Sequence, residues 1–373
     1  MRAVLAALRA WDAAGLPGAL ARVVATEGSS PRDPGAAMAV SADGGVVGSL
    51  SGGCVEAAVV EDALDVLERR VPRRRRFGYS DADALGIGLT CGGELDVYIE
   101  PYRWPAAGAD ALLGALGGSS PSGVATLLEA ARGPAGAGAA LILAGDTTFG
   151  SLGDAELDRV VGRDLVAVAD TASASAVRRY GCRGEALQED VTIFLQGFAP
   201  ARRLVVVGAT DFAAALCAQA KLLGYHVTVC DARAAFATAA RLPAADGVVV
   251  DWPDRHLSAL EPALGPRDAV CVLSHDPKFD VPALRAALAQ GAGYIGAMGS
   301  RRTVADRRAR LAAAGVDAAA LARIRMPIGL DLGARTPAET AVSICAEMIL
   351  TGRGGVGGLP LSAGAGPIHP AGA

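Results

Sequence analysis

The sequence predicts an α/β protein in two parts: an N-terminal α/β part built from an internal repeat, and a Rossmann-like doubly wound parallel sheet after it. Two segments within the first 199 residues share one order of strands, turn and helix. From about residue 200, short apolar runs alternate with helical stretches, which is typical of a parallel sheet. The chain has 373 residues, 51% of them hydrophobic, so it is long enough for two or three buried cores.

The first expected element is a helix within residues 1–15. Leu5, Leu8 and Trp11 recur at helical spacing, and charged residues such as Arg9 interrupt them. The apolar core of a secretory leader would not contain such charges, and no stretch of the chain approaches the ~20 strongly apolar residues of a membrane span. We therefore expect a cytoplasmic protein without a membrane partner.

The charge balance argues against a nucleic-acid partner. Lys and Arg number 35 and Asp and Glu 39, which gives a net charge of −4. The one dense basic cluster, Arg73 to Arg76, is typical of a solvated loop or edge rather than of a nucleic-acid site.

The internal repeat organises the first half of the chain. The first copy consists of residues 36–40, an Asp-Gly turn, Gly48-Ser-Leu50 and a helix. The second copy has the same order, with residues 139–143, a turn, Gly150-Ser-Leu152 and a helix. Each copy closes on a similar strand, at residues 97–100 and 193–196. The two copies therefore look like halves of one fold.

Composition and pattern indicate where the domains end. We expect the first copy at residues 1–104, a degenerate second copy packed with it at 105–199, a Rossmann-like domain at 200–351 and a disordered tail at 352–373. The stretch from Pro105 to Pro121 is rich in Ala, Gly and Ser and is expected to connect the copies. The tail is Gly, Pro, Ala and Ser without periodicity.

Seven widely spaced cysteines without a CxxC pair argue against a disulfide scaffold or a zinc site. Four of them lie in apolar patterns and are expected to be buried: Cys217, Cys230, Cys271 and Cys345. Cys54 and Cys91 differ, because each adjoins a Gly-Gly pair, Gly52-Gly53 before the first and residues 92–93 after the second.

Cys54 and Cys91 are the candidate catalytic thiols and metal ligands. Gly52 and Gly53 permit a tight turn and close approach of a ligand, and we expect Cys54 in the first helical turn, where N–H groups and the helix dipole favour a thiolate. Two thiols in one small domain suit a soft metal or the relay of a sulfur atom. Packing of Cys54 against the preceding strand is the alternative.

Aligning the two copies assigns the thiols to the first copy alone. Gly48 set against Gly150 places Cys54 opposite Glu156, and alignment of the closing strands places Cys91 opposite Leu187. Thiol chemistry therefore belongs to the first copy.

A polar loop over residues 28–32 precedes the first copy's central turn. Ser29, Ser30 and Arg32 supply two hydroxyls and one guanidinium, which suit a phosphate or the edge of a pterin. An ordinary turn whose serines cap their own backbone is the alternative.

In the second half, Gly208 follows a strand and opens a helix, as in a dinucleotide fingerprint. Thr210 stands in place of the second Gly and Ala213 in place of the third, and Thr210 would hinder backbone approach to a pyrophosphate. The fingerprint for a nucleotide or NAD(P) is therefore incomplete. Asp231 lies 23 residues after Gly208 and is either a ribose-binding carboxylate or the cap of a following helix.

Two further motifs end strands at the carboxyl edge of the expected sheet. In Ser274-His275-Asp276, His275 is a candidate for acid/base work or metal ligation, or simply forms hydrogen bonds, and Asp276 is a candidate cofactor contact. Gly299, Ser300, Arg301 and Arg302 lead from the fifth strand into a helix and suit an anion. Solvated arginines are the alternative there.

Together these segments resemble the xanthine dehydrogenase accessory protein family, also called the XdhC/CoxI family. The matching runs are residues 28–32, Gly48-Ser-Leu-Ser-Gly-Gly-Cys54-Val-Glu56, Cys91-Gly-Gly93, Ser274-His-Asp276, residues 293–302 and residues 327–334. The resemblance implies a maturation factor rather than a catalyst. Such a factor protects the molybdenum cofactor (molybdopterin), assists its sulfuration and inserts it into a xanthine dehydrogenase or CO dehydrogenase-type molybdenum hydroxylase.

The candidate residues fit such a cofactor, because molybdenum favours soft thiolate ligands and a phosphate or nucleotide tail favours arginines and helix N-termini. Cys54 and Cys91 would contact sulfur or molybdenum, and Arg32, Ser300, Arg301 and Arg302 would bind the phosphate or nucleotide tail. The expected partners are a molybdenum hydroxylase, a cysteine desulfurase and, because edge strands of the repeat are able to pair, a second copy in a homodimer. The alternatives are an NAD(P)-dependent oxidoreductase using His275 and an interaction module without a ligand.

Overall fold

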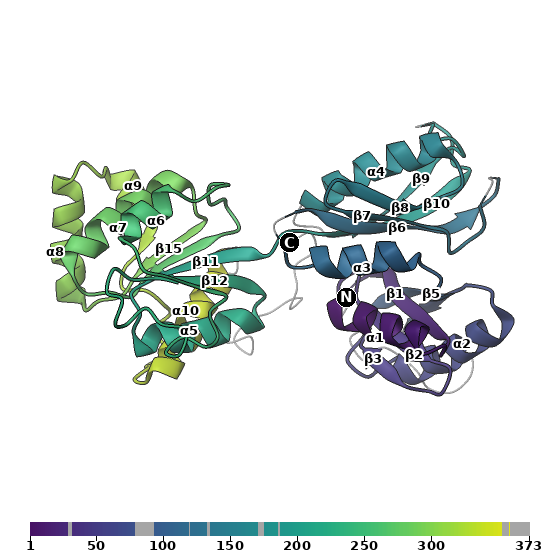
Figure 1. Cartoon of the computed structure of the whole chain (residues 1–373), viewed down its shortest axis with the longest axis horizontal. Coiled ribbons are helices and arrows are strands. Elements are labelled where there is room, and N and C mark those ends of the chain that lie inside the picture. The colour runs from purple at the N-terminus through teal and green to yellow at the C-terminus, as the bar shows by residue number, and fades with distance from the viewer. Residues whose placement is uncertain are drawn as a thin grey trace. The chain divides into compact units, whose positions relative to one another are not determined.

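The computed structural model describes residues 1–28, 32–78, 93–118, 120–132, 135–170, 175–185, 187–352 and 358. These residues form two compact units, the first ending at Pro200 and the second beginning at Ala201, and each is described by itself (Figure 1). None of the described helices is long and apolar enough to cross a membrane.

Within its described residues, the first unit holds two five-stranded antiparallel sheets with the same strand order. The first copy contains α1 (Arg2–Ala13), β1 (Gly18–Glu27), β2 (Ala37–Ser41), β3 (Val46–Gly48), α2 (Glu56–Arg69), β4 (Arg73–Phe77) and β5 (Glu94–Pro101). The second contains α3 (Ala106–Ala115), β6 (Ser122–Ala130), β7 (Ala140–Ala144), β8 (Thr147–Gly150), α4 (Ala155–Asp170), β9 (Ser175–Tyr180) and β10 (Val191–Phe198). The orders β3-β2-β1-β5-β4 and β8-β7-β6-β10-β9 confirm the predicted internal repeat.

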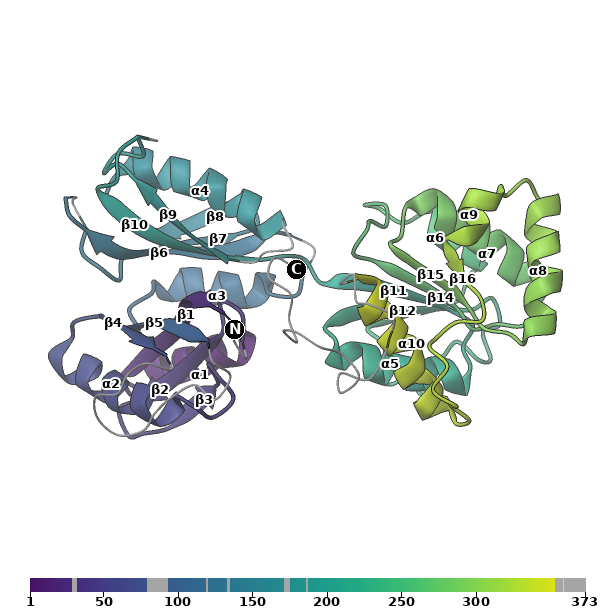
Figure 2. The ribbon, with the colours of Figure 1, turned by 180° about the vertical axis from the view of Figure 1, so that it is seen from behind.

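The helices of the first unit form an inner and an outer layer. Leu20 on β1 and Ile142 on β7 pack with Leu5 of α1 and Leu112 of α3, so α1 and α3 lie between the two sheets (Figure 2). Alternate residues of a strand point to opposite faces of the sheet. The residues on either side of Leu20 in β1 therefore pack under α2, and those on either side of Ile142 in β7 pack under α4.

Helix α3 corrects an expectation. The composition from Pro105 to Pro121 predicts only a connection, but α3 fills most of this stretch and is the counterpart of α1. Small residues allow the helix to pack closely, since a Cβ at Gly108 would lie 2.7 Å from the Cβ of Phe149. Composition alone indicates a loop, while packing between the sheets stabilises the helix.

The arginine run is likewise a strand, β4, at the edge of the first sheet rather than a loop. Arg73 and Arg75 point to one face and form ion pairs with Asp62 of α2. Arg74 points to the other face and forms an ion pair with Asp96. Four like charges are tolerated in one strand because carboxylates meet them on both faces.

A buried arginine joins the two copies. The Arg22 side chain is fully buried between the sheets, and its Nη2 donates hydrogen bonds to Glu100 (2.7 Å) and to the Thr126 hydroxyl of the second copy (2.6 Å). Its guanidinium lies 5.6 Å from the Trp104 ring centre and 5.5 Å from that of Phe194. Burial raises the pKa of Glu100 to about 7, although Arg22 acts in the opposite direction.

The second unit is a parallel sheet with helices on both faces, which confirms the predicted fold class. Its strands are β11 (Arg202–Val207), β12 (Tyr225–Cys230), β13 (Gly247–Val249), β14 (Ala269–Val272), β15 (Tyr294–Ala297) and β16 (Ile324–Arg325), in the order β13-β12-β11-β14-β15-β16. Helices α5 (Asp211–Leu222) and α10 (Pro337–Gly352) cover one face. Helices α6 (Pro253–Ser258), α7 (Pro277–Gln290), α8 (Arg301–Ala313) and α9 (Ala318–Ala322) cover the other.

Other predictions for the second unit are also confirmed. The apolar runs expected from about residue 200 onward form β11 to β15, and among the strands that the structure describes in this unit only the two-residue β16 was missed. The four cysteines expected to be buried are buried. The tail predicted to be disordered lies outside the described residues, apart from Gly352, which ends α10, and Gly358.

Candidate functional site

Cys54 lies, half-buried, in the loop that joins β3 to α2. The expectation that it occupies the first helical turn is wrong, because α2 begins at Glu56 and Val55 is its N-cap residue. The thiol side chain packs against the apolar cluster beneath α2, as the alternative expects, and remains partly exposed. The side chain of Glu56 explains the late start of the helix.

The carboxylate of Glu56 is hydrogen-bonded by seven groups of the preceding loop. The Ser49 hydroxyl and the N–H groups of Leu50, Ser51 and Gly52 donate to Oε1, at 2.7 to 3.1 Å, and the Ser51 hydroxyl and the N–H groups of Gly53 and Val55 donate to Oε2, at 2.6 to 3.2 Å. Burial opposes ionisation of Glu56, but the donors, with Ser51 first among them, hold its pKa well below the usual range. The loop is thus wrapped around a fixed negative charge.

Gly52 and Gly53 have backbone conformations that favour glycine, with φ of +87° and +128°. A Cβ built at either residue would have no atom within 4 Å, so the outer side of the loop is open. The two glycines are therefore required by the turn, and they also leave the backbone beside Cys54 accessible to a ligand.

The rest of the predicted site in the first unit is only partly described. Cys91, Ser29 and Ser30 lie outside the described residues. Arg32 is exposed. The pKa of the Met1 amino group is lowered mainly because that group is buried, and secondly because of the positive charge of Arg32. Among the side chains that the structure describes, no group of three or more His, Cys, Asp or Glu is arranged to hold a metal ion.

The second copy keeps the carboxylate without the thiol loop. Asp158, aligned with Glu56, accepts hydrogen bonds from the Ser151 hydroxyl and the Leu152 N–H, both at 2.7 Å. The Asp154 side chain accepts from the N–H groups of residues 156 and 157 and caps α4. Glu156, opposite Cys54, is exposed and forms an ion pair with a neighbouring arginine of the same helix.

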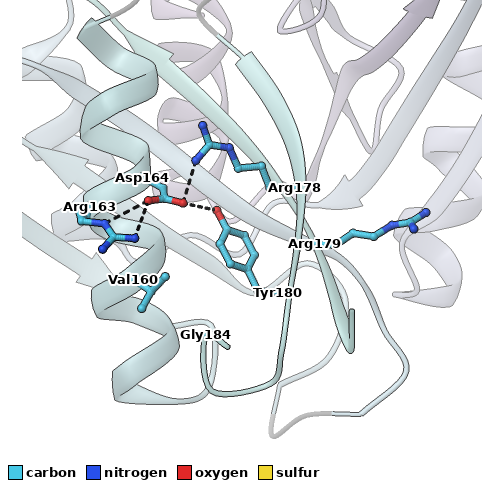
Figure 3. A pocket seen from close by; sticks show the side chains of 7 residues that line it. All are labelled: Val160, Arg163, Asp164, Arg178, Arg179, Tyr180 and Gly184. Carbon is cyan, nitrogen blue, oxygen red and sulfur yellow. Dashed lines mark hydrogen bonds and ion pairs between the residues drawn. The ribbon is translucent and has the colours of Figure 1, made fainter. Parts of the chain in front are cut away.

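A concave site of about 450 Å³ lies between α4 and β9 of the second copy (Figure 3). At its centre Asp164 accepts hydrogen bonds from Arg178 (2.8 Å), Tyr180 (3.1 Å) and Arg163 (3.1 Å). The ion pair of Asp164 and Arg178 repeats that of Asp62 and Arg75 in the first copy. The site contains none of the sequence-predicted residues. The charge of its central carboxylate, Asp164, is balanced by two arginines of the chain that donate hydrogen bonds to it.

In the second unit, Gly208 and Ser274 meet where the strand order reverses, between β11 and β14. A Cβ at Gly208, whose φ is +101°, would lie 3.0 Å from the Ser274 backbone nitrogen. The Thr210 hydroxyl accepts a hydrogen bond from the Ala213 N–H (3.2 Å) and caps α5. The Ala213 N–H lies at the helix start, where a pyrophosphate would bind, and it already donates a hydrogen bond within the chain.

Asp231 does not have the helix-capping role that was one of its two expected roles, and its carboxylate is hydrogen-bonded within the chain. Its carboxylate accepts hydrogen bonds from the Ala209 N–H (2.8 Å) and from the backbone and guanidinium of Arg233 (2.7 to 2.9 Å), and it caps no helix among those described. Burial opposes its ionisation, but Arg233 and Ala209 outweigh burial and lower its pKa. Both oxygens already accept hydrogen bonds within the chain, so a ribose at Asp231 would have to replace some of them.

The two remaining motifs do lie at the carboxyl edge of the sheet, as predicted. His275 is exposed, and Asp276 caps α7 by accepting a hydrogen bond from the Lys278 N–H (3.1 Å), which lowers the pKa of Asp276. Ser300 caps α8 through the Thr303 N–H (3.2 Å). The next two residues, Arg301 and Arg302, have exposed side chains, and Gly299 precedes them.

A buried pair connects these motifs to each other. Ser274 donates to Asp280, and Arg307 donates both to Asp280 (2.5 Å) and to the carbonyl oxygen of Met298 (2.7 Å). Asp280 and Arg307 are both buried. The loop that carries His275 and the loop that carries Ser300 are therefore held by one network.

Two family models match the two units. The XdhC and CoxI family model matches residues 11–78, which include the Cys54 loop, and the XdhC Rossmann domain model matches residues 204–348. The chain belongs to the XdhC and CoxI family.

Similar proteins span nearly the whole length of this XdhC and CoxI family member. A protein of Bacillus subtilis (strain 168), named as a probable xanthine dehydrogenase subunit, is 28% identical over 339 residues, 89% of this chain and 92% of the relative. The "molybdenum cofactor insertion chaperone PaoD" of Escherichia coli (strain K12) is 27% identical over 329 residues, 88% of this chain and 81% of the relative. A crystal structure described as a xanthine dehydrogenase from Bacillus halodurans superposes with a TM-score of 0.71 at 25% identity, covering 94% of this chain and 96% of that one.

Proposed function

We propose that this chain is a maturation factor that binds the molybdenum cofactor and delivers it to a molybdenum hydroxylase. The observation that carries the proposal is the Cys54 loop, a partly exposed thiol beside two glycines whose outer side is open. The similarity to a protein named as a molybdenum cofactor insertion chaperone and to one named as a probable xanthine dehydrogenase subunit supports this choice among thiol functions.

The described part of the loop fits such a ligand. A thiolate is a soft donor of the kind that suits a molybdenum centre, and the open backbone at Gly52 and Gly53 admits a flat pterin. When bound, the cofactor supplies a metal centre that accepts a sulfur ligand. In this proposal Cys54 and Cys91 contact the metal or the incoming sulfur, and Arg32 contacts a phosphate.

The finer points of the function are part of the same proposal. We assign the phosphate or nucleotide tail to the segment of Ser300, Arg301 and Arg302, at the start of α8. The client is a xanthine or CO dehydrogenase-type enzyme, a cysteine desulfurase supplies sulfur, and the chain acts in the cytoplasm as a homodimer. Binding of a nucleotide or NAD(P) at the second unit, with His275 as acid or base, stays a hypothesis. The side chains of Thr210 and Asp231 already accept hydrogen bonds from backbone N–H groups of the chain.

The proposal is tested by the cofactor that the full chain retains on purification. Molybdenum and molybdopterin are quantified in the wild type, in Cys54→Ser and in Cys182→Ser, a matched control that replaces the half-buried cysteine of the second copy. Loss of a metal contact should lower retained cofactor at least about tenfold in Cys54→Ser, as for other metal-site substitutions. Cys182→Ser should retain as much as the wild type. Equal amounts in all three proteins would contradict the proposal.

A further inference from the structure

The backbone of the Cys54 loop has the form of an anion-binding site that the chain fills itself. The six N–H groups from Leu50 to Val55 all point inward, five to the Glu56 carboxylate and that of Cys54 to the Ser51 hydroxyl at 2.9 Å. That hydroxyl in turn donates to Glu56 Oε2 (2.6 Å). Successive N–H groups around glycines of positive φ form such concave sites for anions.

The second copy shows what a shorter carboxylate does at the same place. Asp158 lacks one methylene relative to Glu56, and among the described hydrogen bonds it accepts those of Ser151 and Leu152 only. Helix α4 begins at Ala155, which aligns with Gly53, whereas α2 does not begin until Glu56. The residues that form the first turn of α4 are therefore drawn into a loop in the first copy.

We propose that Glu56 is the positioning residue of the Cys54 site. Its carboxylate binds the N–H groups of the loop and so holds Cys54 against the cluster beneath α2 with the Gly52 and Gly53 backbone facing outward. This inference rests on the proposed function of Cys54. It also implies that the loop offers a ligand its thiol rather than its N–H groups, so the phosphate of a ligand binds elsewhere.

The experiment measures how fast iodoacetamide alkylates Cys54 in the full-length, cofactor-free chain at one fixed pH. Peptide mass spectrometry follows the Cys54 peptide, with the Cys182 peptide of the same digest as internal reference. The variants are Glu56→Gln, Glu56→Asp and, as matched control, Asp158→Asn. Thermal unfolding of each variant is recorded alongside.

Glu56→Gln should alkylate Cys54 about tenfold faster, because a loop that loses its charge-assisted hydrogen bonds opens locally. The Cys182 rate should not change. Glu56→Asp should regain much of the thermal stability, since Asp158 shows that the shorter side chain still reaches the Ser and Leu positions, but its Cys54 rate should stay raised. Asp158→Asn should lose stability without changing the Cys54 rate.

Two results would overturn the inference. One is a Cys54 rate that equals the wild-type rate in both Glu56 variants. The other is a rise that Asp158→Asn or the Cys182 peptide shares, since that would indicate general loosening. If Glu56→Gln does not fold, the Glu56→Asp variant alone decides, through its split between recovered stability and raised rate.

The fate of the proposed function is read separately, from cofactor retention. Glu56→Gln should retain as little cofactor as Cys54→Ser, and the double variant should retain no less than either. If Cys54→Ser keeps its cofactor while Glu56→Gln still speeds alkylation, the proposed function fails at Cys54 and the positioning role of Glu56 stands.

Discussion

The two copies of the repeat share a strand order but begin their outer helices differently. Both place a Ser-Leu pair after a glycine and hydrogen-bond that pair to a carboxylate of the following helix, Glu56 in one and Asp158 in the other. Only the first copy extends this contact to two glycines, and the N–H of Cys54 follows them by donating to the Ser51 hydroxyl. The carboxylate anchor is thus common to both copies, and the glycine-thiol loop belongs to the first copy alone.

The copies also differ at the centre of the unit, where they meet. The strand registers of the two sheets make Arg22 of the first copy equivalent to Thr126 of the second. They likewise make Glu100 equivalent to Gln196. The second copy thus contributes neutral groups where the first contributes a buried ion pair. Gln196 donates to the carbonyl oxygen of Gly35 in the first copy (2.7 Å), so contacts cross in both directions.

The largest expected effect comes from breaking the buried ion pair. At pH 8, Arg22→Met should lower the free energy of unfolding by about 3–5 kcal/mol, because Glu100 must then either stay buried as an unpaired carboxylate or take up a proton that it does not hold in the unfolded chain. Thr126→Val, the matched change in the second copy, should cost about 1 kcal/mol for one lost hydrogen bond. Chemical denaturation measures both. A double variant that adds Glu100→Gln to Arg22→Met should recover part of the loss, and equal effects of the two single changes would contradict this asymmetry.

The next effect is a pH dependence that only the first copy has. Burial raises the pKa of Glu100 from 4.5 to about 7 in the folded chain, so the folded state holds this proton more tightly than the unfolded state. Its contribution to stability is full below about pH 4.5 and is lost as the pH rises through about 7, a fall of about 3 kcal/mol. Denaturation at several pH values should show this fall in the wild type and not in Glu100→Gln, which carries the residue of the second copy.

A smaller effect separates glycines that both copies need from those that only the first needs. A Cβ at Gly48 or Gly150 would lie 2.4 or 2.3 Å from a carbonyl oxygen, so Gly48→Ala and Gly150→Ala should each cost about 2–3 kcal/mol in thermal or denaturant unfolding. Gly52→Ala meets no atom and should cost only about 1–2 kcal/mol for its positive φ. Gly52→Ala should nevertheless reduce cofactor retention more than Gly150→Ala does, and the reverse order would argue against a ligand at this loop.

Sequence reasoning succeeded where local pattern and long-range packing agree. The repeat and strands β11 to β15 follow from apolar periodicity, and the buried positions of Cys217 and Cys271 follow from it as well. It failed at α3, where small residues resemble a linker until the packing between the sheets is known. It also failed at β4, whose arginines are neutralised by carboxylates distant in sequence.

The candidate site shows the same limit. The glycine pair predicted a tight turn before Cys54, and Gly52 and Gly53 have the positive φ of such a turn. The predicted helix start was wrong, because a side chain of the helix itself binds the loop. Glu56 had a signal in the sequence, since an acidic residue recurs at Asp158 at the same distance from Gly150 as Glu56 has from Gly48. Only the geometry showed that seven donors converge on it.

The hydrogen bond from Arg22 to Thr126 makes the two copies of the first unit depend on each other. A half-molecule ending near residue 104 would leave a guanidinium, a carboxylate and a row of leucines facing water. Each copy thus shields these buried groups of the other from water. The second copy, which has no cysteine at the loop after Gly150, therefore supplies part of the packing around the copy that carries Cys54.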